Sequence, residues 1–199
     1  MFIELTDHLR CPADHAESFL VLIPEELNGR TVRRGLLGCP LCRREYPIID
    51  GVVRFGEGAG PVAAMPEVGA VNAAAIAAFL GIEGPGGYVA LVGDAAGFVS
   101  ELSRLWPGIH LVAVNPPAGT VPADWHSVVL APRLPIKTRA LRGIVLGAPF
   151  GQLAPWPEQA VQAVLPGLRA VGRGPAPDVV GFELLGEAEG WWVGRRVGR

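Results

Sequence analysis

The chain has 199 residues, half of them hydrophobic, and a formal net charge of −2 at pH 7. This balance indicates a globular protein with a sizeable core and excludes a general electrostatic attraction to nucleic acid or acidic membranes. Three cysteines, two of them in a Cys-x-x-Cys pair, favour a metal site in a reducing compartment over a disulfide framework, so we expect a cytoplasmic protein. No apolar stretch is long enough to span a membrane, and the start lacks the pattern of a secretory signal.

The first 55 residues predict a small β module. The expected elements are one or two helical turns over 5–10, a strand over 19–23, a turn over 24–29 and a second strand over 31–37. A segment of this size buries too little apolar surface to be stable alone, so a bound metal ion is a natural means of stabilising it.

The cysteines of this module predict a tetrahedral zinc site. Cys11, Cys39 and Cys42 supply three ligands. The fourth is Asp14, which stands where a Cys-x-x-Cys partner would be, or His15, which is chemically the better zinc ligand one residue later. The residue pattern leaves both alternatives open.

This module resembles a known family. Cys11-Pro12, then Cys39-x-x-Cys42, then the Tyr-Pro-Ile-Ile-Asp-Gly run within residues 45–53, is similar to the Trm-type zinc ribbon. That family includes short bacterial proteins and the eukaryotic subunit that activates several methyltransferases. The resemblance covers about the first quarter of the chain and implies zinc binding and a partner-binding or stabilising role next to a methyltransferase. Asp14 departs from the family, which has a second cysteine at this position.

Residues 67–199 predict an α/β domain, joined to the module of residues 1–55 by a linker over 56–66 that is rich in Gly, Pro and Ala. Helices are expected over 67–80, after the turn at 93–98, and over 157–169; strands are expected over 88–92, 109–114, 127–130, 140–147, 178–185 and 190–197. Alternating strands and helices followed by a hairpin predict a mostly parallel sheet with an antiparallel edge.

This order resembles the class I S-adenosylmethionine-dependent methyltransferase fold, from about residue 68 to the end. Residues 128–136 are similar to the third-strand loop of that family, and residues 170–175 to its turn before the fifth strand. The resemblance implies a Rossmann-like sheet. It also implies an S-adenosylmethionine site formed by Gly93, Asp94, Gly97 and Asn115.

The glycine-rich turn of this implied site is altered. Gly93 and Gly97 are kept, but Ala95 replaces the middle glycine, and its methyl group narrows the approach of a cofactor. Leu91 replaces the acidic residue at the end of the first strand, and Asp94 offers a displaced carboxylate.

The two polar contacts further along the chain are also weakened. Asn115 replaces the acid that accepts hydrogen bonds from both ribose hydroxyls, and Ala131-Pro132 offers no side-chain acceptor for the adenine amino group. At about 1 kcal/mol per lost hydrogen bond, cofactor affinity falls by about two orders of magnitude or more.

These substitutions favour a non-catalytic methyltransferase-like scaffold or interaction protein, with no predicted catalytic residue. Its expected partner is a protein, either a methyltransferase or a second copy of the chain. One alternative is an active S-adenosylmethionine-dependent methyltransferase with an atypical cofactor site. A weaker alternative is an RNA-binding accessory protein that uses the arginines of the N-terminal module.

Overall fold

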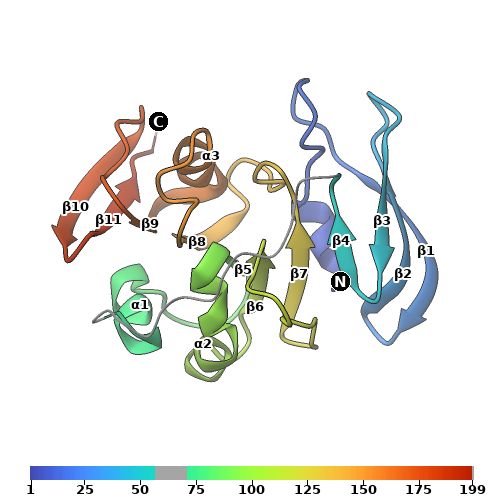
Figure 1. Cartoon of the computed structure of the whole chain (residues 1–199), viewed down its shortest axis with the longest axis horizontal. Helices are drawn as coiled ribbons and strands as arrows, with labels where there is room; N and C mark the ends of the chain where they lie inside the picture. Colours follow the sequence, from blue (N-terminus) through green and yellow to red (C-terminus); the bar gives the residue numbers. More distant parts are fainter. Residues whose placement is uncertain (57–70, 199) are drawn as a thin grey trace.

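A single open sheet runs the length of the molecule (Figure 1). In the computed structural model, which describes residues 1–56 and 71–198, 11 strands form this sheet in the order β1-β2-β3-β4-β7-β6-β5-β8-β9-β11-β10. The strands are β1 (Val21–Asn28), β2 (Thr31–Gly38), β3 (Glu45–Ile49), β4 (Val52–Arg54), β5 (Tyr88–Val92), β6 (His110–Val114), β7 (His126–Leu130), β8 (Leu141–Leu146), β9 (Val164–Arg173), β10 (Phe182–Ala188) and β11 (Trp191–Arg196).

Short helices cover both faces of the central strands. They are η1 (Ile3–His8), α1 (Ala73–Leu80), η2 (Gly93–Phe98), α2 (Val99–Leu105) and α3 (Trp156–Ala163). One core cluster joins α1 and α2 to one face of the sheet, and a second cluster joins η1 and α3 to the other. None of the helices in the described residues is long and apolar enough to cross a membrane.

The central strands form a Rossmann-like sheet, as predicted. β7, β6, β5, β8 and β9 are parallel neighbours, and β9, β11 and β10 pair antiparallel at the far edge. All five residues of β5 are buried, because helices cover both faces of a parallel sheet. The order of the strands reverses between β5 and β8. The crevice outside the carboxyl ends of the strands at such a reversal is where open α/β sheets bind ligands.

The N-terminal module, residues 1–55, extends this sheet. β4 pairs in parallel with β7 through Val52–Val128, Val53–Val129 and Arg54–Leu130, and so covers the edge strand of the central sheet. The apolar cluster on this side contains Val53 and also Val112 from β6. The predicted linker lies outside the described residues apart from Gly56, so the division into two domains stays a prediction.

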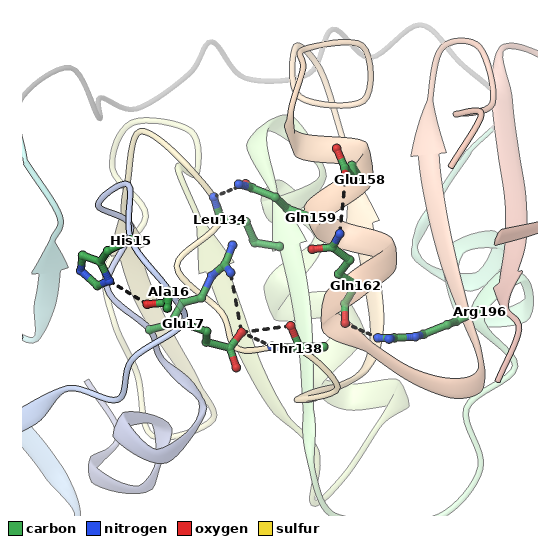
Figure 2. A network of polar contacts seen from close by, with 10 residues as sticks. His15, Ala16, Glu17, Leu134, Thr138, Glu158, Gln159, Gln162 and Arg196 are labelled. Carbon is green, nitrogen blue, oxygen red and sulfur yellow. Dashed lines mark hydrogen bonds and ion pairs between the residues drawn. The ribbon is translucent and has the colours of Figure 1, made fainter. Parts of the chain in front are cut away.

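The start of the chain covers the face beside β7. Leu5 and Leu9 are fully buried in the cluster that contains Leu134 and Ile136 of the connection from β7 to β8. Backbone hydrogen bonds join residues 8–10 to residues 135–137. Figure 2 shows a further tie, in which Glu17 accepts hydrogen bonds from the backbone N–H and the hydroxyl of Thr138. The Leu134 N–H of the same connection donates to the side chain of Gln159 in α3. The N-terminal segment therefore packs where a crossover helix usually lies.

Three predicted elements, one in the N-terminal part and two in the C-terminal part, are wrong. Residues 24–28 of the turn expected over 24–29 belong to β1, and only Gly29 lies in the turn that follows. Pro24 is tolerated because β1 is an edge strand, where a missing N–H costs no ladder bond. The expected helix over 157–169 ends at Ala163, and β9 follows at once. Pro166 cannot continue a helix, and the turn expected over 170–175 is instead strand as far as Arg173.

The first helix of the α/β part begins later than predicted within the described residues. The Asn72 side chain accepts a hydrogen bond from the Ala75 N–H at 2.9 Å and caps α1, and Gly81 ends the helix in the left-handed conformation with φ +58°. Residues 67–70 of the predicted helix lie outside the described residues.

Candidate metal centre and carboxyl edge of the sheet

Four side chains of the N-terminal module meet at one point. One ligand atom each from Cys11, His15, Cys39 and Cys42 lies within 4.8 Å of all the others. Cys39 and Cys42 come from the tight turn between β2 and β3, and Cys11 and His15 come from the loop that follows η1. Asp14 is exposed and does not belong to the cluster.

Two of the distances between these atoms match those expected around a tetrahedral zinc ion. Bonds of about 2.3 Å to sulfur and about 2.0–2.1 Å to nitrogen place two sulfurs about 3.8 Å apart, and a sulfur and a nitrogen about 3.6 Å apart. The Sγ atoms of Cys11 and Cys42 are 3.7 Å apart, and His15 Nε2 is 3.5 Å from Cys39 Sγ. A cluster of three cysteines and one histidine could therefore hold a metal ion of this kind.

Surrounding groups orient the ligands. The Nδ1 atom of His15 lies 2.7 Å from the carbonyl oxygen of Ala16, which leaves Nε2 as the ligand atom (Figure 2). The hydroxyl of Tyr46 lies 3.0 Å from Cys11 Sγ inside the core. A hydrogen bond from the backbone of Arg44 lowers the pKa of Cys42 to about 6, so this thiol ionises near neutral pH. Burial raises the pKa of Cys11.

A local bend places His15, and not Asp14, beside the three cysteines. The His15 N–H donates to the Ala13 carbonyl oxygen at 2.9 Å, and this close turn faces the imidazole toward the cysteines while Asp14 faces solvent. Sequence spacing alone could not separate the two residues, because they are neighbours and the bend depends on the surrounding loop.

The four residues of the implied cofactor site lie at the carboxyl ends of two neighbouring strands. Gly93 and Asp94 directly follow β5, Gly97 lies in η2, and Asn115 directly follows β6. The structure thus places them together near the point where the strand order reverses. What their side chains contact is a separate matter.

Asn115 is bound to the neighbouring chain segment. Its Oδ1 accepts a hydrogen bond from the Ala131 N–H, and its Nδ2 donates to the Ala131 carbonyl oxygen, both at 2.8 Å. The side chain is 3% exposed, and its backbone adopts φ +47°, which asparagine tolerates better than most residues. Asn115 therefore fastens the end of β6 to the end of β7.

Asp94 is likewise engaged by its own fold. Oδ1 accepts a hydrogen bond from the Ala148 N–H at 2.7 Å, and Oδ2 lies 3.3 Å from Nη1 of Arg173. Burial raises the pKa of Asp94, and the Ala148 N–H and the Arg173 charge oppose that rise. The carboxylate thus joins the ends of β5, β8 and β9.

The two glycines differ in their surroundings. A Cβ atom on Gly93, which has φ +65°, would lie 2.4 Å from the Ala148 carbonyl oxygen and 2.7 Å from the Phe150 ring. Packing against the segment after β8 therefore requires this glycine. A Cβ atom on Gly97 would meet nothing within 4 Å, so packing does not require Gly97 to be glycine.

The partners of Asp94 and Asn115 could not have been identified from the sequence. They are two backbone segments, at Ala131 and Ala148, and one arginine 79 positions away from Asp94. Backbone groups carry no residue-type signal, and no local spacing marks Arg173 as a partner of Asp94.

Three cavities in the described part of the chain lie away from these residues. One is at the amino ends of β5 and β6, one lies beside the N-terminal module near Pro132, and one lies between α1 and β11. None of the three is lined by Gly93, Asp94, Gly97 or Asn115.

Neither a protein-family model nor a curated protein matches the sequence. Among solved structures, the chain is similar to the [4+2]-cyclase SpnF, with a TM-score of 0.46 and 12% identity over 57% of each chain. The antibiotic-resistance methyltransferase Kmr has a TM-score of 0.43 and 18% identity over 69% of this chain and 99% of its own. The complex between the Haloferax volcanii Trm112 methyltransferase activator and a putative methyltransferase has a TM-score of 0.36 and 17% identity, over 44% of this chain and 45% of the matched chain. These values establish no activity for this chain.

Proposed function

We propose that the chain is a non-catalytic, methyltransferase-like scaffold that binds a protein partner and whose N-terminal module is held together by zinc. The observation that carries this proposal is the engagement of Asn115 and Asp94, the two polar side chains at the implied cofactor site, by groups of the same sheet. The ribose or an amino group of S-adenosylmethionine that approached this edge would meet side chains that already form hydrogen bonds within the protein.

The cost of releasing one of these residues supports the proposal. Turning Asn115 toward a ribose would leave the buried N–H and carbonyl of Ala131 without partners. Each unpaired buried group costs about 1–3 kcal/mol, so the total of about 2–6 kcal/mol would weaken binding by about 30-fold to more than 10⁴-fold. A new hydrogen bond to the ligand returns only part of this cost.

The segments that follow β5 and β8 are also joined to each other. The Gly147 N–H donates to the Val92 carbonyl oxygen at 2.9 Å, and the Asp94 N–H donates to that of Ala148 at 3.3 Å. The ring of Phe150 packs over Gly93 and on Trp156, with ring centroids 4.4 Å apart. This packing favours a closed carboxyl edge between β5 and β8.

The proposed zinc ion has a structural role. Four protein ligands leave no open coordination position for a water molecule or a substrate, in contrast to catalytic zinc sites. Bound there, the ion would cross-link the loop after η1 to the turn between β2 and β3. Its binding free energy would add to the stability of the N-terminal module.

Calorimetric titration of the purified, zinc-loaded protein with S-adenosylmethionine and S-adenosylhomocysteine tests the proposal. No binding up to millimolar ligand is the expected result. Micromolar binding of either compound would overturn the proposal and favour an active methyltransferase with an atypical site. Titration with a labelled RNA at two salt concentrations tests the third alternative, and a steep salt dependence of RNA binding would favour it.

A further inference from the structure

A cavity of about 420 Å³ opens at the amino ends of β5 and β6, away from the carboxyl edge where Asp94 and Asn115 lie. Its walls include Phe2, Tyr88, His110, Asp124 and Trp125. The volume falls within the range of small-molecule sites, about 300–1,000 Å³. Neither the implied cofactor site nor the metal cluster uses this cavity.

One wall of the cavity is a fixed aromatic cluster. Phe2 stacks on His110 with ring centroids 4.5 Å apart and an interplanar angle of 18°, and Tyr88 meets His110 edge-on at 5.6 Å. The Nε2 atom of His110 lies 2.9 Å from the hydroxyl of Ser127, which holds the imidazole in place. Phe2 already contacts one cation, because the Arg30 guanidinium carbon lies 5.1 Å from its ring centroid.

Trp125 supplies a second aromatic surface at the cavity. Its side chain is 48% exposed, and the ring that packs near it is that of His126, at 5.9 Å. Within the described residues, no ring of the Phe2–Tyr88–His110 cluster stacks on this indole. The partly exposed Trp125 is therefore available for contact with a ligand in the cavity.

The lining of the cavity carries one charged side chain, which is acidic, and the Arg30 guanidinium lies 5.1 Å from the centroid of the Phe2 ring in its wall. Asp124 is the one acidic side chain among the lining residues, which include no lysine or arginine. Within the described residues no hydrogen bond or ion pair engages the Asp124 carboxylate. Burial, followed by the charges of His126 and the N-terminal amine, lowers the pKa of His110 to about 4. The imidazole is therefore neutral at pH 7 and adds no positive charge.

We propose that this cavity binds a methylated ammonium group, of either a small quaternary amine or an N-methylated lysine side chain. Aromatic faces attract cations, and tryptophan does so most strongly. A methylated ammonium suits this site better than a metal ion, because hard cations need several oxygen ligands and the cavity offers one carboxylate. The inference does not depend on the proposed scaffold function.

Titration with choline tests the proposal, and 3,3-dimethylbutan-1-ol serves as the neutral carbon isostere of choline. The other four tryptophans are at most 7% exposed, so tryptophan fluorescence changes on binding report mainly on Trp125. We expect choline to shift the Trp125 fluorescence and the indole NMR signal of Trp125 with a Kd on the order of 1 mM. The neutral alcohol should bind at least about tenfold more weakly than choline. Equal binding of both compounds, or no shift with choline, would overturn the proposal.

Two variants and a matched control locate the site. Trp125→Ala should weaken choline binding about tenfold or more. Because this variant lacks the fluorescent reporter, its binding is measured from the NMR signals of His110 and Ser127. Asp124→Asn should weaken choline binding about threefold to tenfold. Asp178→Asn, which removes an exposed carboxylate elsewhere, should leave binding unchanged. Unchanged binding in both site variants would refute the site.

A trimethyllysine peptide, titrated in parallel with choline, separates the two sources of the ligand. Tighter binding of the peptide assigns the site to a protein tail, and tighter binding of choline assigns it to a free amine. Failure of both ligands would contradict the inference without bearing on the scaffold function, which rests on other residues.

Discussion

At the scale of single residues, Asn115 is the clearest case of a side chain that serves the fold. Both ends of its amide are hydrogen-bonded to Ala131, and its positive φ suits asparagine. An aspartate at this position would offer only acceptors, so it could not donate to the Ala131 carbonyl oxygen. The replacement of the expected acid by asparagine therefore has a physical reason that lies within the sheet.

Asn115→Ala should lower the free energy of unfolding by about 3–5 kcal/mol, because two buried backbone groups lose their partners and alanine is strained at positive φ. Urea denaturation at pH 7 measures this change. Asn28→Ala, at an exposed asparagine at the end of β1, is the control and should change stability by about 0.5 kcal/mol or less. Equal effects of the two substitutions would contradict the role of Asn115.

The neighbours Asp14 and His15 allow a matched test of the metal cluster. Zinc content per chain, measured by mass spectrometry of the metal, should be about one for the unaltered protein and for Asp14→Ala, and well below one for His15→Ala. The reason is that His15 points its Nε2 into the cluster whereas Asp14 is exposed. Zinc lost from Asp14→Ala but kept in His15→Ala would show that the ligand assignment is wrong.

At the scale of elements, His110 connects the start of the chain to three strands. It lies on β6, stacks on Phe2, meets Tyr88 of β5 and contacts Ser127 of β7. Its imidazole is kept neutral by burial, so protonation opposes folding at this junction.

We expect acid to destabilise the protein partly through His110. Its pKa falls from 6.5 to about 4 on folding, so the unfolded chain takes up a proton first, and stability is lost as the pH falls from about 6.5 to about 4. The loss attributable to His110 is about 3 kcal/mol. Urea denaturation from pH 7 to pH 4 should show a smaller loss for His110→Gln than for the unaltered protein. Parallel pH profiles of the two proteins would exclude this role.

The errors in element prediction have local causes. The apolar residues that follow α3 fit either a helix or a strand, and pairing with β8 and β11 makes residues 164–173 a strand. The face beside β7 is covered by Leu5 and Leu9 from the other end of the chain. No pattern within the connection from β7 to β8 indicates that a distant segment packs there.

At the scale of the whole molecule, the N-terminal module and the Rossmann-like strands share one sheet and one apolar cluster. Val53 of β4 and Val129 of β7 are paired, and both are fully buried. Loss of order in the N-terminal module would expose the edge of β7 and the apolar surface that Leu5 and Leu9 cover.

Zinc removal should therefore lower the melting temperature of the whole chain in a single transition. Differential scanning calorimetry with and without a strong chelator measures this effect. The Cys39→Ser/Cys42→Ser double variant should melt at the lower temperature and respond no further to the chelator. A high-temperature transition that stays unchanged while a second, chelator-sensitive one moves would show instead that the two parts unfold independently.

The sequence by itself determined the features that depend on near neighbours. These are the apolar strands, the turns that contain Gly and Pro, the parallel sheet with its antiparallel edge, and the three cysteines at metal-binding spacing. The ends of β5 and β6, which Gly93, Asp94 and Asn115 directly follow, were also predicted, and the cofactor site at these residues stays a prediction.

Only the tertiary structure decided the contacts between distant segments. It paired β4 with β7, selected His15 over Asp14 in the cluster, and bound Asn115 and Asp94 to backbone groups of other strands. These contacts join residues that no periodicity relates, and backbone donors and acceptors are the same at every position. For that reason, the partners of these side chains, and with them the function that the edge of the sheet can support, were fixed by the folded chain.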